Sequence, residues 1–321
     1  MSRPTVMATE KARPDELVLA TRIARRYFLD NRSKLEIAEE FAISRFKVAR
    51  LLDVARDTGI VTITVTGPGA LDTELSEALR RRFGLDHAVV ISTSAGDDGR
   101  IREQLGEVAA ELLTEIATPQ DVLGLGWARA VLAMAPHLQD LSLTGVVQLT
   151  GALTRPDVDA SATELVRDIA RRTQAEASVF YAPMIVSDTA AANALARQQQ
   201  LVDTFARFAR VTKAVVGIGG WNPPASTLHD ALNPRERDLM RQHGVHADLS
   251  GVLLDATGAA VSTPMVKRII AISARQLHQI PMVIGIAYGA PKAPAVRAAL
   301  AGGYLHALVT NTTLAEHLLA Q

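Results

Sequence analysis

The pattern of hydrophobic and polar positions divides the chain into two parts. From Asp15 to Gly59, apolar residues recur every three or four positions in three successive segments, as they do in amphipathic helices. From about residue 70 onward, short apolar runs that are typical of buried strands alternate with helical segments. The pattern predicts a small helical domain followed by a larger α/β domain.

The helical part is predicted to pack three apolar faces together. The first helix spans residues 15–31, and the second and third lie on either side of Ala42 and Ile43. The positions that should face inward are Leu17, Ala20, Ile23, Ala24 and Tyr27 in the first helix, Leu35, Ile37, Ala38 and Phe41 in the second, and Val48, Leu51, Leu52 and Ala55 in the third.

Capping residues mark where the second and third helices begin. Ser33 with Glu36 three positions later is a capping box, and Ser44 is placed to cap the third helix. Gly59 is suited to a left-handed end of that helix. Residues 60–65 (IVTITV) then alternate like a strand, so the prediction is a winged helix-turn-helix.

The third helix carries the residues expected to read DNA. Arg45, Phe46, Lys47 and Arg50 fall on its outward face and its N-terminal end, where a helix-turn-helix addresses base edges and phosphates. Similar short helix pairs also occur in proteins that never contact nucleic acid. The net charge is +3 over residues 1–66 and −3 over the remainder, which supports local phosphate contacts and not a broad basic surface.

The second part of the chain is predicted to form a Rossmann-like α/β domain, with a mainly parallel sheet covered by helices on both faces, because apolar strand segments alternate with segments of helical periodicity. The predicted strands are 87–92, 121–125, 146–151, 179–183, 213–219, 282–289 and 307–311, and helices are expected at 71–83 and 101–116. The expected domains are a tail at 1–13, the DNA-binding domain at 14–66 and an α/β domain at 67–321, with a linker at 66–69 between the last two.

Composition narrows the class of protein. With 321 residues and 48% hydrophobic residues, the chain is long enough for two folded domains. It has no apolar run of about 18 residues and no apolar signal core near its start, so we expect a cytoplasmic protein without a membrane partner. The absence of Cys excludes disulfides and thiol catalysis and removes the commonest zinc ligand.

Glycine and polar residues follow several predicted strands, which is where open α/β sheets place their ligands. These residues are Gly124, Gly126 and Trp127, then Thr150 and Gly151, then Gly217, Gly219 and Gly220, and finally Tyr288, Gly289 and Lys292. They predict a site for a small polar or anionic ligand. Glycine at these positions can also serve only to form turns.

Two residues stand out as candidate ligand contacts. Lys292 is one of only three lysines beyond residue 66 and precedes a predicted helix, a suitable place for a phosphate or carboxylate contact. A solvated surface lysine is the alternative. Asp248 could accept hydrogen bonds from sugar hydroxyls, or could cap a helix or turn.

Two other constellations are discounted. His243, His246 and Asp248 resemble a metal cluster, but they fall in a predicted loop and no second cluster is visible. GLGWAR at 124–129 lacks the third Gly and the later acidic residue of the dinucleotide fingerprint. We therefore expect neither a metal nor a redox cofactor, and we assign no catalytic residue.

The order of these parts resembles the SorC family of bacterial transcriptional regulators. The resemblance rests on EIAEEFAISRFKVARLLDVARDTGIVTITV followed by LGLGWARA, VVQLTGAL, GIGG, PASTL, GVLLDATG and YGAPKA, and it covers the chain from about residue 14 to its end. It implies a homo-oligomer, a dimer or commonly a tetramer, that binds operator DNA and responds to a sugar or sugar phosphate. It also implies an effector domain similar to sugar-phosphate isomerases and deaminases.

The resemblance and the strand-end pattern together give two sets of candidate residues. The candidate DNA contacts are Ser33, Lys34, Ser44, Arg45, Phe46, Lys47 and Arg50. The candidate effector contacts are Gly124, Gly126, Trp127, Ala128, Arg129, Thr150, Gly151, Asp188, Gly217, Gly219, Asp248 and Lys292.

The chain departs from the family after the tryptophan, where the family usually has Gly, Arg and Thr. Ala128, Arg129 and Ala130 stand here, so one phosphate-holding hydroxyl is missing. Ala128 also adds a Cβ to a turn expected to favour positive φ. Thr150 has no amine, which excludes a Schiff base at that position. These departures leave room for a free sugar or polyol.

The sequence favours a transcriptional regulator of carbohydrate metabolism genes whose DNA affinity is modulated by a carbohydrate-type ligand. One alternative is a sugar-phosphate isomerase or deaminase with an appended DNA-binding domain, for which Asp248, His243 and His246 are the nearest candidate acids and bases. The other is a protein-interaction scaffold, for which an exposed Phe46 would be the supporting feature.

Overall fold

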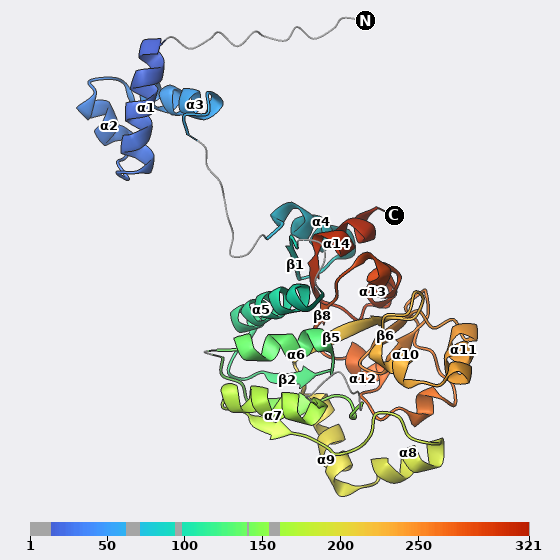
Figure 1. Ribbon diagram of the computed structural model, residues 1–321. Coiled ribbons are helices and arrows are strands. Elements are labelled where there is room, and N and C mark those ends of the chain that lie inside the picture. The colour runs from blue at the N-terminus through green and yellow to red at the C-terminus, as the bar shows by residue number, and fades with distance from the viewer. Residues whose placement is uncertain (1–13, 62–70, 94–97, 140, 154–160, 321) are drawn as a thin grey trace, which may run out of the picture. The chain divides into compact units, whose positions relative to one another are not determined.

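The computed structural model describes residues 14–61, 71–93, 98–139, 141–153 and 161–320. The chain divides into two compact units, residues 1–66 and 67–321, drawn in Figure 1. The predicted tail at 1–13 and the predicted linker at 66–69 lie outside the described residues.

The first unit consists of three helices, α1 (Pro14–Phe28), α2 (Lys34–Glu40) and α3 (Arg45–Asp57). Their buried faces form one hydrophobic core made of Ala20, Ile23, Ala24, Ile37, Ala38, Val48, Leu51, Leu52 and Ala55. The predicted caps are confirmed, because Ser33 and Glu36 form a capping box and Ser44 accepts a hydrogen bond from the backbone N–H of Lys47. Gly59 has φ of +75°, as expected for a left-handed helix end. Helices α2 and α3, joined through residues 41–44, are the predicted helix-turn-helix.

Leu35 and the segment 60–65 were predicted to be an inward-facing residue and a strand of this unit. Leu35 was expected to face inward, but its side chain is 60% exposed, because the short helix α2 turns only Ile37 and Ala38 fully into the core. Of the predicted strand at 60–65, Ile60 and Val61 form a bend and partly cover the core, and residues 62–65 lie outside the described part of the chain.

The second unit is built on a parallel sheet with the strand order β1-β9-β8-β5-β2-β3-β4. Its strands are β1 (His87–Ile91), β2 (Val122–Leu125), β3 (Gly145–Gln148), β4 (Glu176–Ser178), β5 (Lys213–Gly220), β8 (Met282–Ile286) and β9 (Ala307–Asn311). An antiparallel hairpin, β6 (Ala247–Leu249) and β7 (Val252–Leu254), pairs with the end of β5. The mainly parallel α/β architecture predicted from the sequence is confirmed.

The helices of this unit lie before, between and after the strands along the chain. They are α4 (Thr73–Phe83), α5 (Asp98–Ile116), α6 (Arg129–Met134), α7 (Ala162–Arg172), α8 (Thr189–Ala196), α9 (Gln199–Arg207), α10 (Thr227–Ala231), α11 (Pro234–Gln242), α12 (Ala274–His278), α13 (Ala293–Ala301) and α14 (Thr312–Leu319). Short 3-10 turns lie at Ala135–His137, Phe208–Arg210, Val266–Arg268 and Ala290–Lys292.

Helices cover both faces of the sheet, so successive residues of one strand enter different cores. In β5, Ala214 and Val216 join a core with α4, α12, α13 and α14, whereas Val215 joins a core with α5, α6 and α7. Figure 1 shows these two helical layers on opposite sides of the strands. Burial on both faces explains why the strands read as continuous apolar runs.

One predicted strand is wrong. Residues 179–183 were expected to form a strand, but the strand is Glu176–Ser178, and only Pro183 of the predicted segment forms an isolated bridge, to Ala152. At Phe180, the Gln148 side chain replaces the missing sheet partner: its amide nitrogen donates to the Phe180 carbonyl at 3.2 Å, and its oxygen accepts from the Phe180 N–H at 3.4 Å. The burial of Phe180 therefore reflects core packing beyond the end of a strand.

Candidate functional site

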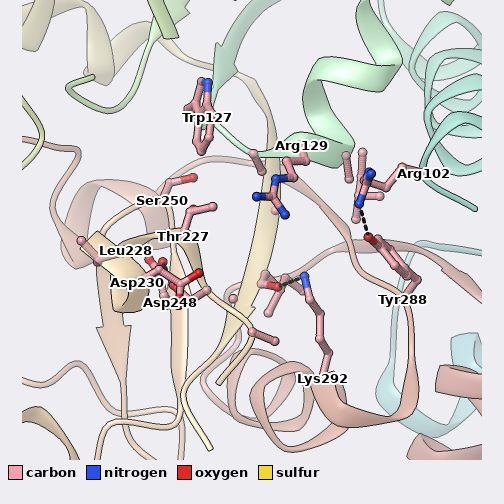
Figure 2. Close-up of a pocket in the computed structure, with 18 of the residues that line it drawn as sticks. Arg102, Trp127, Arg129, Thr227, Leu228, Asp230, Asp248, Ser250, Tyr288 and Lys292 are labelled. Carbon is pink, nitrogen blue, oxygen red and sulfur yellow. Dashed lines mark hydrogen bonds between the residues drawn. The ribbon is translucent and has the colours of Figure 1, made fainter. Parts of the chain in front are cut away.

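A cavity of about 350 Å³ opens at the carboxyl ends of β2, β5 and β8. Its walls come mainly from the start of α5, residues 127–130 after β2, residues 217–219 of β5, residues 225–230, the β6–β7 hairpin, and residues 286–292 at and after the end of β8, and Leu153 and Met184 complete the lining. This is the edge where ligands bind in open α/β sheets. Figure 2 shows the polar side chains that converge on it.

Acidic and hydroxyl groups form one wall of the cavity. Asp248 is 7% exposed and accepts hydrogen bonds from the Ser226 hydroxyl at 2.8 Å and from the Gly251 N–H at 2.9 Å. Burial raises the pKa of Asp248, and those two hydrogen bonds and the positive charge of Lys292 oppose the rise. Asp248 is thus a cavity residue that also holds the hairpin turn, so the interpretation as a turn cap is confirmed, and the contact with sugar hydroxyls stays a prediction. Thr227 and Asp230 line the same side.

Cationic groups form the opposite wall. The Lys292 ammonium donates to the Ile218 carbonyl at 2.7 Å and lies 5.6 Å from the centre of the Tyr288 ring. The Tyr288 hydroxyl accepts a hydrogen bond from Arg102 of α5 at 3.1 Å. Arg129 projects toward the cavity between the two walls in Figure 2.

Burial lowers the pKa of Lys292 to about 8. The carboxylates of Asp248 and Asp98 act against this shift, whereas Arg129 and Arg102 add to it. Arg102 and Arg129 therefore both act on Lys292 as like charges. A ligand with an anionic group would relieve their repulsion, and its hydroxyls could bond to the acidic wall.

Ser250 is the one cavity residue whose buried side-chain oxygen has no hydrogen-bond partner among the described residues. It occupies the turn of the β6–β7 hairpin at φ of +53°, followed by Gly251 at +88°, as two-residue hairpin turns require. A Cβ at Gly126 would lie 1.8 Å from the Ser250 hydroxyl oxygen. Gly126 therefore makes room for the hairpin and does not itself line the cavity.

The structure brings together seven of the candidate effector contacts and leaves five elsewhere. The seven that line the cavity are Trp127, Ala128, Arg129, Gly217, Gly219, Asp248 and Lys292. Asp188 was expected there as well, but it is an exposed cap that accepts from the Ala191 N–H at 2.8 Å at the start of α8. Gly124 is buried within β2, where a Cβ would lie 2.9 Å from Val211 and 3.0 Å from Leu149.

Thr150 and Gly151 lie behind the cavity wall. The Thr150 hydroxyl accepts from the Trp127 N–H at 3.4 Å, so it supports the segment that carries Trp127. The Gly151 N–H donates to the Ile270 carbonyl, and a Cβ at Gly151 would lie 2.7 Å from the Met184 backbone. Close backbone packing explains this glycine.

The expectation that Ala128 strains its turn is wrong. Ala128 has φ of −158° and ψ of 152°, which is extended backbone that any residue adopts. A Cβ at Gly217 would lie 2.3 Å from the Ala128 Cβ, so the small residue is needed at 217 and not at 128.

Several cavity residues were missed by sequence reasoning. Arg102, Ser226, Thr227 and Ser250 were not among the candidate residues, although PASTL was part of the family resemblance. The capping pattern at Ser226 was the available signal, because its hydroxyl accepts from the His229 N–H at the start of α10. No local sequence pattern identifies Arg102 as a cavity residue, because it reaches the cavity only through the packing of α5 on the sheet.

The candidate DNA contacts lie on the exposed side of the first unit. Ser44, Arg45, Phe46, Lys47 and Arg50 are all exposed, and the Phe46 side chain is 88% exposed. Arg50 forms an ion pair with Glu16 of α1 at 3.0 Å. Lys34 lies over the Tyr27 ring at 5.7 Å, and Ser33 is occupied by its capping box.

A helix-turn-helix unit combined with an α/β unit that holds a ligand-sized polar cavity defines a ligand-responsive transcriptional regulator. The family model described as "Putative sugar-binding domain" matches residues 69–320. The chain therefore belongs to this family of sugar-binding domains, in its SorC-type form.

Individual relatives agree with this assignment. The sorbitol operon regulator of Klebsiella pneumoniae is 29% identical over 317 residues, which cover 95% of this chain and 98% of that protein. The transcriptional regulator LsrR of Klebsiella pneumoniae subsp. pneumoniae is 28% identical over 307 residues, or 94% of this chain and 93% of LsrR. The crystal structure of full-length SorC from Klebsiella pneumoniae matches with a TM-score of 0.73 at 27% identity and covers 96% of this chain and 100% of SorC.

Within the described part of the chain, no helix has both the length and the apolar composition needed to cross a bilayer.

Proposed function

We propose that this chain is a transcriptional regulator of carbohydrate metabolism genes that binds operator DNA through α3 and a sugar, polyol or sugar phosphate in the cavity. The observation that carries the proposal is the pairing of an acidic and hydroxyl wall, built around Asp248, with a cationic wall around Lys292. The names of the relatives, a sorbitol operon regulator and LsrR, support the same class of activity. We assign the cavity to ligand sensing and not to catalysis.

Two features bear on whether the ligand is phosphorylated. Ala130 supplies no hydroxyl to a phosphate, which favours a free sugar or polyol. The extended backbone of Ala128 removes the other objection to a phosphate, and Arg102, Arg129 and Lys292 line one cavity. Both classes of ligand therefore belong in the test.

Ligand binding can change DNA affinity only if the ligand prefers one arrangement of the regulator over another. We propose that the α/β unit assembles into a dimer or tetramer and thereby sets the spacing of paired DNA-binding units. A coupling free energy of roughly 1 to 3 kcal/mol, typical of allosteric proteins, would change operator affinity about 5- to 150-fold.

The DNA claim is tested by fluorescence anisotropy with genomic promoter fragments. We expect salt-sensitive, sequence-specific binding, because phosphate contacts release counterions. Arg45→Ala should weaken binding more than Arg50→Ala, since Arg50 is already paired with Glu16. Binding that is unchanged after both arginines are replaced would refute α3 as the reading helix.

The ligand claim is tested by thermal shift with hexitols, hexoses and hexose phosphates. A ligand that binds the folded state raises the melting temperature by mass action. Asp248→Asn should abolish the shift for every responding compound, whereas Asp188→Asn is the matched control outside the cavity. Turnover of a hexose phosphate by the purified protein would instead support an enzyme.

A further inference from the structure

Phe46 is an apolar side chain in a position that the fold does not require. It is the second residue of α3, and at 88% it is the most exposed large hydrophobic side chain among the described residues. The core of the unit is formed by the opposite face of α3, through Val48, Leu51 and Leu52.

Phe46 is surrounded by positive charge. Arg45 and Lys47 on either side are exposed, and within the described residues neither forms an ion pair. The first turn of α3 contains no acidic residue. An acidic polymer therefore fits this surface better than a neutral protein groove, because the cations on both sides of the ring would contact phosphates.

The chemistry of the ring restricts what it can recognise on DNA. A phenyl group neither donates nor accepts a conventional hydrogen bond, so it cannot read the polar edges of guanine, cytosine or adenine. The 5-methyl group of thymine is the apolar group that the major groove presents. We propose that Phe46 is a specificity-determining residue that contacts a thymine methyl group in each half-site of the operator, an inference that rests on the proposed function.

The test replaces the methyl group and the ring separately. Duplexes that bind the full-length protein are first selected from a random pool, and each thymine of the selected site is then changed to uracil. We expect one symmetric pair of positions at which uracil weakens wild-type binding about fourfold per half-site, the effect of burying one methyl-sized group. Phe46→Ala should bind the thymine and uracil duplexes equally at that pair.

The control is Val18→Ala, which removes another exposed hydrophobic side chain, 62% exposed, from α1. It should keep the wild-type preference for thymine. Circular dichroism should show all three proteins equally folded, since neither side chain is buried.

The outcomes separate this inference from the proposed function. If no duplex is selected, both are overturned. If a duplex is selected but uracil has no effect on the wild type, or has the same effect on Phe46→Ala, only the thymine contact is overturned. Retention of thymine preference by Phe46→Ala together with loss of a protein–protein association would assign the ring to protein docking instead.

Discussion

Lys292 should make the stability of the ligand-free protein increase at alkaline pH. Its pKa is lowered from 10.5 to about 8 by burial, and the charged groups that face it are Asp248, Arg129, Asp98 and Arg102. The difference corresponds to about 3 kcal/mol by which the fold disfavours the ammonium form. Between pH 8 and 10.5 the unfolded chain binds more protons than the folded chain, so the free energy of unfolding must rise with pH in this window.

The measurement is urea unfolding of wild type and Lys292→Met at several pH values from 7 to 10.5. Trp127 and Trp221, the two tryptophans of the chain, both lie in the α/β unit and report its unfolding by fluorescence. Groups shared by both proteins cancel in the difference. We expect the unfolding free energy of wild type minus that of Lys292→Met to rise by about 3 kcal/mol across this range.

The same titration should control ligand binding. A phosphate ester keeps its second negative charge above pH 7, whereas the Lys292 ammonium is lost above about pH 8. Affinity for a hexose phosphate should therefore fall about tenfold between pH 7 and pH 9, and affinity for a hexitol should stay constant. A stability difference and a phosphate affinity that are both independent of pH would refute the assignment of Lys292 as a buried cation of the cavity.

Two further predictions concern residues that stabilise the α/β unit. Burial alone would raise the pKa of Asp121, but hydrogen bonds from Thr212, Lys213 and Thr118 lower it to about 2. Asp121→Asn should therefore destabilise the α/β unit by about 2 kcal/mol at pH 7. In urea unfolding, this difference from wild type should decrease as the pH falls from 4 toward 2, and a difference that does not change with pH would contradict the prediction. Gly126→Ala should lower stability by roughly 1 to 3 kcal/mol through its clash with Ser250, and much less in a Ser250→Gly background; equal losses in both backgrounds would exclude the clash.

The fold was predictable where local pattern and burial agree. The predicted strand 307–311 is observed as Ala307–Asn311, because a strand covered on both faces is mainly apolar and Asn311 at its end caps the following helix. Residues 179–183 are apolar for a different reason, since Phe180 fills the core after the strand has ended. An apolar run alone does not distinguish these two environments.

The site was predictable mainly where a residue lies near the carboxyl end of a strand. Trp127, Arg129 and Lys292 lie in the segments that follow β2 and β8, and the topology brings the carboxyl ends of these strands together. Arg102 is 186 positions from its partner Tyr288, so only the packing of α5 places it in the cavity. Asp188 was predicted to line the cavity but does not, because an aspartate directly before a helix is already explained by its role as the helix cap.

The distribution of charge in the cavity indicates what a bound ligand would compensate. Asp248 is buried and Lys292 is partly buried, and burial shifts the pKa of each toward the neutral form. The two walls come from segments that are far apart in the chain, with Asp248 in the hairpin, Arg102 in α5 and Lys292 after β8. A ligand that bonds to both walls would compensate their charges and fix these segments relative to one another, whereas a ligand that bonds to one wall would leave the other free to move. The differential affinity on which regulation depends should therefore require a molecule long enough to span the cavity.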